Sequence, residues 1–325
     1  MVFKPHFIID PRVDWSMLSR NPNAIHILER NYDKINWFGL SENPNAIHLL
    51  AKNLRRINCS LFSRNPNAIP ILQNNLRKIE WRELSRNPNA IPILEQNLDK
   101  VSWPELSINP NAIHILEKNM SKVNLGNLAH NPMAVHLLPD NISEHYYHII
   151  SLNPNAIPIL EKNLDKVDWH LLSQNPNAIP LLKQNFDKIY WSGLSRNPSP
   201  DAIPLLEKNL DKVDWVELSG NPNAIHILEK NVDKIDWFEL SKNPNAIHIL
   251  EKNLDKADWD YLSRNPNAVH LFCSLDTNKM REQNRKFAEE LVAKVLNPKR
   301  IERFCVAYDT CFMDYTEYYE ECDIY

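Results

Sequence analysis

An Asn-Pro pair that recurs at a nearly constant spacing constrains this chain more than any other feature of its sequence. The pair begins at twelve positions: Asn21, Asn43, Asn65, Asn87, Asn109, Asn131, Asn153, Asn175, Asn197, Asn221, Asn243 and Asn265. Every step is 22 residues except that from Asn197 to Asn221, which is 24, and the consensus reads D-W-x-x-L-S-x-N-P-N-A-I-H/P-I-L-E-K-N-L-D-K-V. Such self-similarity is typical of a solenoid, in which each unit buries its apolar face against its neighbours.

Glycine is too scarce for the common nucleotide-binding loops. The 325 residues contain four glycines, and no two of them lie within twenty residues of each other. A dinucleotide fingerprint or a nucleotide-triphosphate loop needs clustered glycines, so the sequence argues against both, and we expect no cofactor. The net charge of −4 gives no general attraction to nucleic acid or membranes.

The remaining composition indicates an intracellular chain. The N-terminus, MVFKPHFIIDPRVDW, lacks the apolar stretch of a signal peptide, and no window of eighteen apolar residues occurs. The five cysteines are an odd number, and none of them has the spacing of a zinc site. We therefore expect a protein that is not secreted and does not enter a membrane.

Capping residues and prolines predict that each unit is a pair of short helices. Asp214 and Asp236 each precede a glutamate by three residues, which is the spacing of a capping box, and Ser102 with Glu105 matches it. A second helix follows each Asn-Pro, and we expect the second Asn of N-P-N, or Asp201 in the longer unit, to cap it. In seven units a histidine stands four residues after the proline of Asn-Pro, and in five units a proline takes its place: Pro70, Pro92, Pro158, Pro180 and Pro204. With the cap at the second Asn or at Asp201, these five prolines fall within the first turn of the second helix. Ile91, Leu94 and Leu98 would share one face of this helix.

A leucine-rich repeat is the alternative, because its units also span 20–29 residues. That fold requires an L-x-L strand. In this chain, however, the position two residues before the leucine of L-S-x-N-P holds Arg82, Pro104 or Val216 instead of a leucine. We favour an all-α solenoid of about twelve helical pairs, right-handed or nearly straight.

The unit NPNAIHILEKNLDKVDW resembles the asparagine-proline tandem repeats of proteins from giant nucleocytoplasmic DNA viruses of amoebae. The likeness covers residues 11 to about 270, and the segment from Asn297-Pro298 to Phe304, with Tyr308 and Asp314-Tyr315, is similar to a tail found in the same viruses. The resemblance implies a viral origin, and hence the host cytoplasm, the host nucleus or the virion as location. It implies no activity.

Two columns of the repeat predict structural roles. All nine tryptophans occupy one column, which we interpret as repeat core because Cys59, Leu125 and Tyr147 also fill it: Trp15, Trp37, Trp81, Trp103, Trp169, Trp191, Trp215, Trp237 and Trp259. An asparagine follows the second helix in eleven units, beginning with Asn31. We expect it either to adopt the left-handed conformation that ends the helix or to satisfy backbone groups between units.

Surface columns give the candidate interaction residues. The residue before each Asn-Pro varies most, and its cations are the candidate contacts: Arg20, Arg64, Arg86, Arg196, Lys242 and Arg264. A lysine column that includes Lys34, Lys100 and Lys188 could follow phosphates, but aspartate precedes most of its members, so a mixed-charge face is favoured. Seven column histidines, including His26 and His48, do not predict a metal site, because adjacent helices lie too far apart to share an ion.

The sequence divides into three parts. Residues 1–14 form a partial first unit, residues 15–270 form the solenoid with its 24-residue unit at 197–220, and residues 271–325 form a helical C-terminal cap with an acidic aromatic tail. In the cap, Met280, Phe287, Leu291 and Val295 would lie on one helix, and Ile301, Phe304 and Tyr308 on another. Residues 121–152 are degenerate, and we expect a bend or a loosened joint there, unless Asn131 simply caps a shifted helix.

These features favour a non-enzymatic scaffold that binds a viral or host protein along its surface or assembles with itself as a homo-oligomer. The repeat provides many equivalent units and no recurring catalytic set outside its own columns. A helical-repeat nucleic-acid reader is the alternative, because six of the twelve residues before Asn-Pro are Arg or Lys.

Overall fold

The structure, a computed structural model, describes residues 7–295, 297, 299–301 and 303. The chain divides into two compact units, Pro11–Phe272 and a second formed from the two ends of the chain. All twelve repeats lie in the first unit, and we number them from the residue before the tryptophan column, so that repeat 1 is 14–35 and repeat 12 begins at 258. With this numbering, a repeat begins at each of the predicted capping residues Ser102, Asp214 and Asp236.

The all-α solenoid is confirmed, and every repeat begins with a short α-helix. In the described part of the chain these first helices are α1 (Trp15–Arg20), α3 (Trp37–Glu42), α5 (Cys59–Arg64), α7 (Trp81–Arg86), α9 (Trp103–Ile108), α11 (Leu125–His130), α12 (Tyr147–Leu152), α14 (Trp169–Gln174), α16 (Trp191–Arg196), α18 (Trp215–Ser219), α20 (Trp237–Lys242) and α22 (Trp259–Arg264). Asp214 and Asp236 cap their helices as expected, whereas Ser102 holds the cap position without a side-chain hydrogen bond.

A second helix follows each Asn-Pro. The α-helical ones are α2 (Ile25–Arg30), α4 (Ile47–Lys52), α6 (Ile69–Gln73), α8 (Ile91–Glu95), α10 (Ile113–Glu117), α13 (Ile157–Glu161), α15 (Ile179–Gln184), α17 (Ile203–Glu207), α19 (Ile225–Lys230) and α21 (Ile247–Glu251). Repeats 6 and 12 have the 3₁₀ helices η7 (Pro132–Leu137) and η13 (Val269–Phe272) in that place. The repeat prolines fall in the first turn as predicted.

The predicted caps and one predicted core residue of the second helix are wrong. Alanine occupies the cap position, as Ala68 does for α6, and it makes no side-chain bond, while Asp201 lies one residue further from α17. The first Asn of the pair instead caps a 3₁₀ turn, where the Oδ1 of Asn65 accepts from the N–H of Asn67. Helix α8 ends at Glu95, so Leu98 is not on it and is exposed.

The asparagine that begins each Asn-Pro pair ties its repeat to the one before. Its Nδ2 donates to two carbonyl oxygens of the preceding repeat at 2.8–3.3 Å, as Asn175 does to Ser151 and Asn153. We call these twelve residues, from Asn21 to Asn265, the asparagine ladder. All are buried. Because each amide satisfies two carbonyls at the end of a first helix, the ladder fixes the spacing between repeats.

The serine of L-S-x-N-P supports the ladder. Ser19 Oγ donates to the carbonyl oxygen of Trp15 and accepts from the N–H of Asn36, the first residue of the next repeat. The second asparagine adds a bond at the surface, where Asn45 Nδ2 donates to the carbonyl oxygen of Pro22. Between these bonds lies the core, where Leu40, Ala46 and Leu50 are completely buried, as are their equivalents except Leu138 of repeat 6, which is half-buried.

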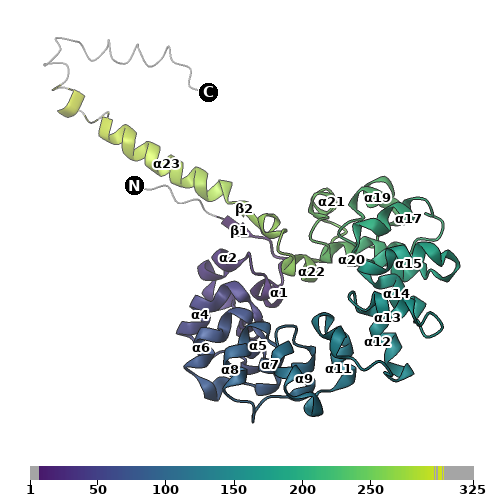
Figure 1. The fold of residues 1–325 in the computed structure, drawn as a ribbon. Coiled ribbons are helices and arrows are strands. Elements are labelled where there is room, and N and C mark those ends of the chain that lie inside the picture. The colour runs from purple at the N-terminus through teal and green to yellow at the C-terminus, as the bar shows by residue number, and fades with distance from the viewer. Residues whose placement is uncertain (1–6, 296, 298, 302, 304–325) are drawn as a thin grey trace. The chain divides into compact units, whose positions relative to one another are not determined.

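The ladder continues across the two ends of the array, so the repeats form a closed ring (Figure 1). Asn21 Nδ2 donates to the carbonyl oxygens of Ser263 and Asn265 at 3.0 and 2.9 Å, and the N–H of Asp14 donates to Ser263 Oγ at 3.0 Å. Helix α1 therefore packs against α22 as each first helix packs against the next. The expected right-handed or nearly straight course is wrong, because the last repeat is hydrogen-bonded to the first, which an open solenoid does not allow.

The N-terminal residues complete the last repeat rather than form a partial first unit. Arg12 and Val13 occupy the Lys-Val columns, and the Arg12 guanidinium lies 4.0 Å from the ring centroid of Trp259 while its Nη1 donates to Leu254 O. Val13 is buried like Val101 at the end of repeat 4. The expected unit at 1–14 is therefore wrong for Phe7–Ile9, which forms strand β1. Residues 1–6 lie outside the described residues.

The second compact unit combines both ends of the chain. Strand β1 pairs antiparallel with β2 (Cys273–Leu275), with Ile8 opposite Ser274, and α23 (Thr277–Val295) follows. The predicted helix before Asn297 is therefore present. Since α22 packs against α1, the ring has no open end, and the expected role of residues 271–325 as a cap over exposed core is wrong. The predicted helix through Phe304 and Tyr308, and the acidic aromatic tail, lie outside the described residues.

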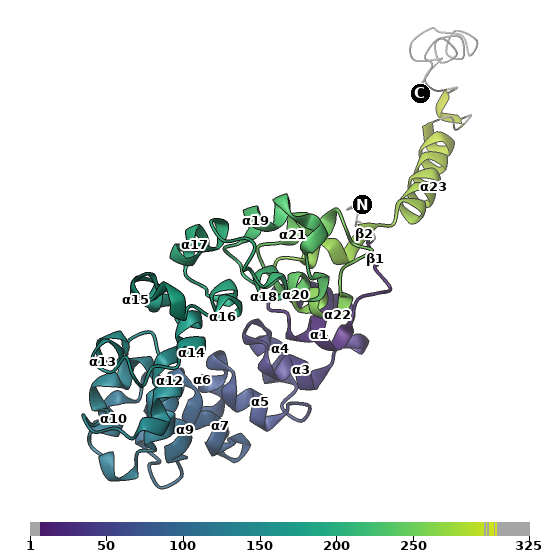
Figure 2. The same cartoon turned by 90° about the vertical axis from the view of Figure 1, so that its right-hand side faces the viewer.

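First helices lie on the inner side of the ring and second helices outside them (Figures 1 and 2). The first helices contact their neighbours directly, whereas second helices meet adjacent repeats mainly through 3₁₀ turns such as η2 (Pro44–Ala46) and η3 (Pro66–Ala68). The first helices are the more closely spaced layer, so they lie on the inner side of the ring, where the circumference is shorter.

The degenerate stretch keeps the ladder but loses other bonds. Asn131 caps η7, which begins at Pro132, as the alternative interpretation of this stretch predicts. Asn131 and Asn153 still bridge to the repeats before them. Ala129 replaces the ladder-supporting serine, and Met133 replaces the second asparagine. The joint is therefore continuous but has fewer bonds.

Because the ring is closed, replacement of Asn21 should destabilise the fold. In an open array the same replacement would be harmless, because no repeat would precede Asn21. In Asn21→Ala, the carbonyl oxygens of Ser263 and Asn265 and the N–H of Asn23 lose their hydrogen bonds to the side chain, and we expect about 1–3 kcal/mol of destabilisation. Asn175→Ala, in mid-array, should cost the same, which urea unfolding of both variants measures. The exposed Asn177→Ala is the matched control. A neutral Asn21→Ala beside a costly Asn175→Ala would show an open array.

The loss of bonds in the degenerate stretch predicts faster local opening. A 3₁₀ helix has poorer hydrogen bonds than an α-helix, so amides of residues 132–146 should exchange with deuterium faster than those of residues 221–265. Hydrogen exchange read by mass spectrometry checks this. Equal protection in the two segments would exclude a loosened joint.

Candidate interaction surface

The tryptophan column lies at the edge of the core, not within it. Each tryptophan is the first residue of its first helix, as Trp37 is for α3, and all nine are partly exposed. The fully buried position is three residues further on, where Leu18, Leu40 and Leu84 are completely enclosed. The interpretation of the tryptophans as repeat core is therefore correct only for one side of each ring.

Cations of the lysine column cover most of these exposed ring faces. The lysine at the end of a repeat lies over the aromatic ring at its start, as Lys234 does at 4.6 Å from the centroid of Trp215. The same contact is made by Arg56 on Trp37, Lys100 on Trp81, Lys122 on Trp103, Lys166 on Tyr147, Lys212 on Trp191 and Lys256 on Trp237. These cations join the two ends of each repeat, so they are not an open row for phosphates.

An exposed apolar row runs beside the tryptophans. It occupies the position after the asparagine that follows each second helix, and its large side chains are 36–48 % exposed. We define the apolar row as Tyr32, Leu76, Leu98, Met120, Leu164, Phe186, Leu210 and Val232. Tyr32 and Phe186 contact the next tryptophan, Trp37 and Trp191, edge to face at 5.5 and 5.7 Å. Sequence reasoning missed this row, because an apolar column in a solenoid looks like core.

The asparagine before the apolar row has a local role that differs from both expectations. Asn31 has φ −127° and ψ 53°, which is not the left-handed conformation. Its Nδ2 donates to the carbonyl oxygen of Ile27 in its own helix, and Asn53 and Asn75 repeat the bond with Leu49 and Ile71. The amide thus satisfies the end of its own helix and makes no bridge between repeats.

All six candidate contact cations are paired with glutamates. Arg20 lies 2.6 Å from Glu42, Arg64 3.6 Å from Glu83, Arg86 2.6 Å from Glu105, Arg196 3.5 Å from Glu217, Lys242 2.7 Å from Glu239 and Arg264 3.8 Å from Glu42. Most pairs join neighbouring repeats on the inner side of the ring. The candidate cations are therefore paired within the molecule. The glutamates two residues after tryptophan could have suggested this for four of them, whereas Glu42 lies outside that column.

Two of these pairs form larger groups. Glu42 receives both Arg20 and Arg264, so it links repeats 1, 2 and 12 across the ring closure. Glu105 is only 6 % exposed, and its two oxygens lie 2.9 Å from Arg82 Nε and 2.6 Å from Arg86 Nε. The first contact is a hydrogen bond, and the second has the distance of an ion pair without hydrogen-bond geometry.

The column histidines pair with glutamates on the second helices. His48 Nε2 lies 2.8 Å from Glu29 of the preceding repeat, and His114, His226, His248 and His270 make the same contact with Glu95, Glu207, Glu229 and Glu251 at 2.6–2.7 Å. Among the described residues, no three His, Cys, Asp or Glu side chains form a group that could hold a metal ion. Cys305 and Cys311 lie outside those residues.

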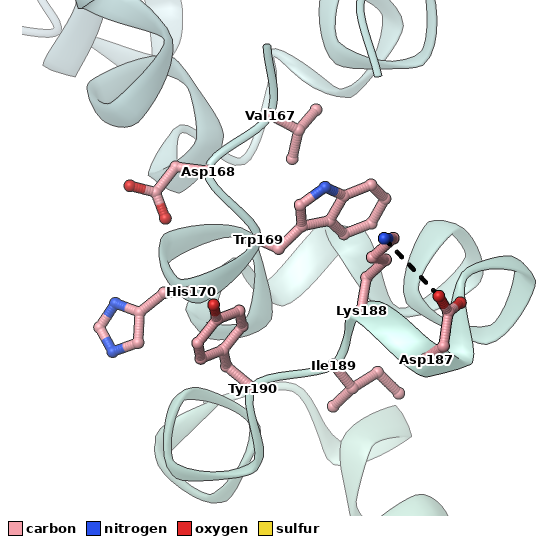
Figure 3. A pocket seen from close by; sticks show the side chains of 8 residues that line it. All are labelled: Val167, Asp168, Trp169, His170, Asp187, Lys188, Ile189 and Tyr190. Carbon is pink, nitrogen blue, oxygen red and sulfur yellow. Dashed lines mark ion pairs between the residues drawn. The ribbon is translucent and has the colours of Figure 1, made fainter. Parts of the chain in front are cut away.

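Two surface cavities lie in the less regular half of the ring. One, of about 470 Å³, has Pro132, Met133, Leu138 and Ile159 among its lining and results from the replacement of an α-helix by η7. The other, of about 550 Å³, surrounds Trp169 in repeat 8 (Figure 3). Both occur where the residues depart from the repeat consensus, at Met133 and at Tyr190.

No helix in the part of the chain that the structure describes combines the length and apolar character needed to cross a bilayer. Comparison with known proteins finds no matching family model, no matching curated protein and no matching solved structure.

His130, at the end of α11, predicts a pH-dependent contribution to stability. Burial, and secondly the charge of His148, lower the pKa of His130 below its ordinary value of 6.5. As pH falls through 6.5, the unfolded chain takes up a proton that the folded chain resists, so folding is destabilised. Urea unfolding between pH 8 and pH 5.5 should show the wild type losing stability relative to His130→Gln. A constant difference between the two proteins would contradict this.

Proposed function

We propose that the protein is a non-enzymatic ring-shaped scaffold that binds a viral or host protein along its apolar row. Assembly of the ring with itself, as a homo-oligomer, is the second form of the same function. The observation that carries the proposal is the apolar row itself, large side chains exposed at the equivalent position in eight of the twelve repeats. Apolar surface that recurs in a line, rather than singly, is characteristic of protein-binding surfaces.

The charges favour protein over nucleic acid as partner. A nucleic-acid reader needs cations that are free to neutralise phosphates. Here the cations at the ends of the first helices are paired with glutamates, and most cations of the lysine column lie on aromatic rings. The resemblance to repeats of giant viruses adds the host cytoplasm, the host nucleus or the virion as the proposed location.

The ring places the apolar row at equivalent positions of its repeats, with interruptions at Leu54, Ile142 and Leu254, which are less exposed. Because the ladder repeats the same bonds at every joint, equivalent side chains such as Leu76 and Leu98 lie at the same height around the ring. A partner can therefore contact several repeats through one recurring type of side chain. Repeat proteins typically bind along extended surfaces of this kind.

The test compares the wild type with the triple variant Leu76→Gln/Met120→Gln/Leu164→Gln. These side chains are exposed, so the variant should keep its fold and its melting temperature. We expect chemical crosslinking in lysates of infected amoebae to capture a protein with the wild type that the variant loses. Light scattering after gel filtration follows the same comparison for ring self-association.

The matched control is the triple variant Glu29→Gln/Glu95→Gln/Glu229→Gln, which changes as many exposed side chains on the second helices. It should capture the same protein as the wild type. Identical captures by all three proteins, with a monodisperse monomer in each case, would contradict the proposal. Binding of RNA or DNA by the wild type at low salt, with a steep decrease as salt rises, would instead favour the nucleic-acid alternative.

A further inference from the structure

The cavity in repeat 8 is placed where other repeats hold a cation on an aromatic ring. It is lined by Val167, Asp168, Trp169, His170, Asp187, Lys188, Ile189 and Tyr190, which come from the start and the end of the repeat (Figure 3). Its volume of about 550 Å³ is within the usual range for small-ligand sites. Trp169 stands at the centre of the view, between Tyr190 and Lys188.

Seven other repeats place one of their own cations at this position. Lys100 lies 5.1 Å from the centroid of Trp81, and Lys256 lies 4.8 Å from that of Trp237. In repeat 8 the equivalent cation, Lys188, pairs with Asp187 at 3.7 Å and makes no such contact with Trp169. Repeat 1 has the same arrangement, with Lys34 4.0 Å from Asp33.

Tyr190 distinguishes repeat 8 from repeat 1. The residue that begins the next repeat is usually Asp, Asn or Ser, whose short side chain caps a first helix, as Asn36 does after repeat 1. After repeat 8 it is Tyr190, which is 52 % exposed and makes no cap bond. Its ring meets His170 edge to face at 5.5 Å, so the cavity gains a second aromatic wall.

The charge of the cavity suits a cation. Two carboxylates, Asp168 and Asp187, line it together with one ammonium, that of Lys188. Asp168 Oδ1 accepts from the N–H of Leu171, and Asp187 is largely exposed beside the cavity. A cation over Trp169 therefore meets an aromatic ring, with Asp187 on one side of the cavity and Asp168 and Tyr190 on the other (Figure 3), in a lining of net negative charge.

We propose that this cavity, built by Trp169 and Tyr190 with Asp168 and Asp187, binds a lysine or arginine side chain of the partner protein. This inference rests on the proposed scaffold function and adds one point of specificity to it. The guest takes the position over Trp169 that a repeat cation takes elsewhere in the ring. Lys188 is the internal competitor for that position, because a change of its rotamer would bring it over the ring.

Fluorine NMR of the full chain labelled with 5-fluorotryptophan tests the site directly. The nine tryptophans give separate probes, and Trp169→Phe assigns the resonance of Trp169. The ligand is the peptide acetyl-Gly-Lys-Gly-amide, or its arginine equivalent, and acetyl-Gly-Gln-Gly-amide is the neutral control. We expect the cationic peptides to shift the Trp169 resonance at millimolar concentration and to leave that of Trp237, which Lys256 covers, unchanged.

Two variants separate the cavity from a general affinity for exposed tryptophan. Lys188→Ala removes the competitor and should tighten peptide binding at Trp169 by about fivefold, whereas Tyr190→Asp, which restores the repeat consensus, should weaken it by about fivefold. Lys256→Ala uncovers Trp237, but Asp258 follows it in place of a tyrosine, so binding there should remain much weaker.

The outcomes distinguish the site from the scaffold function. Equal shifts with the lysine and glutamine peptides, no shift in either the wild type or Lys188→Ala, or equal binding at Trp237 in Lys256→Ala would overturn the cation site. The scaffold function would stand in each case if capture of the partner still depended on the apolar row. Failure of row-dependent capture would overturn the scaffold, even if the peptide bound at Trp169.

Discussion

The side-chain amide of the asparagine in each Asn-Pro pair is the interaction on which the rest of the structure depends. It donates to two carbonyl oxygens at the end of the preceding first helix, and its own oxygen accepts from the next 3₁₀ turn. Aspartate could not donate these bonds, and glutamine would place its amide one methylene too far. A buried amide with all its partners fixes one distance and one direction, so the same joint recurs twelve times.

Ring closure follows from that uniformity. The same pair of bonds recurs at each joint, and at the last joint it connects Asn21 to the carbonyl oxygens of Ser263 and Asn265. The longer ninth repeat keeps the geometry, because Asn221 still reaches Ser195 and Asn197 while the two extra residues are absorbed around Pro198 and Pro200. Arg12 and Val13 then supply the last repeat with the residues that its own chain does not provide.

Because the core residues are nearly the same in every repeat, the repeats differ mainly in their surface residues. The inner side of the ring balances its cations with glutamates, and the tryptophans are joined to lysines, so most charge is satisfied within the molecule. What remains exposed is the apolar row and the places where the repeat is irregular, such as Met133 and Tyr190. A scaffold built this way can keep one stable ring while single repeats acquire contact residues of their own.

The sequence by itself determined the period, the pair of helices in each repeat and the position of the five column prolines in a first turn, because these depend on local backbone rules. It did not determine which apolar columns are buried: Leu94 and Leu98 look alike, yet only Leu94 is buried. Nor did it show that Arg86 meets Glu105, or that the array closes. Those features depend on the angle between neighbouring repeats, which is set by side chains packed across the joint, and only the tertiary structure contains it.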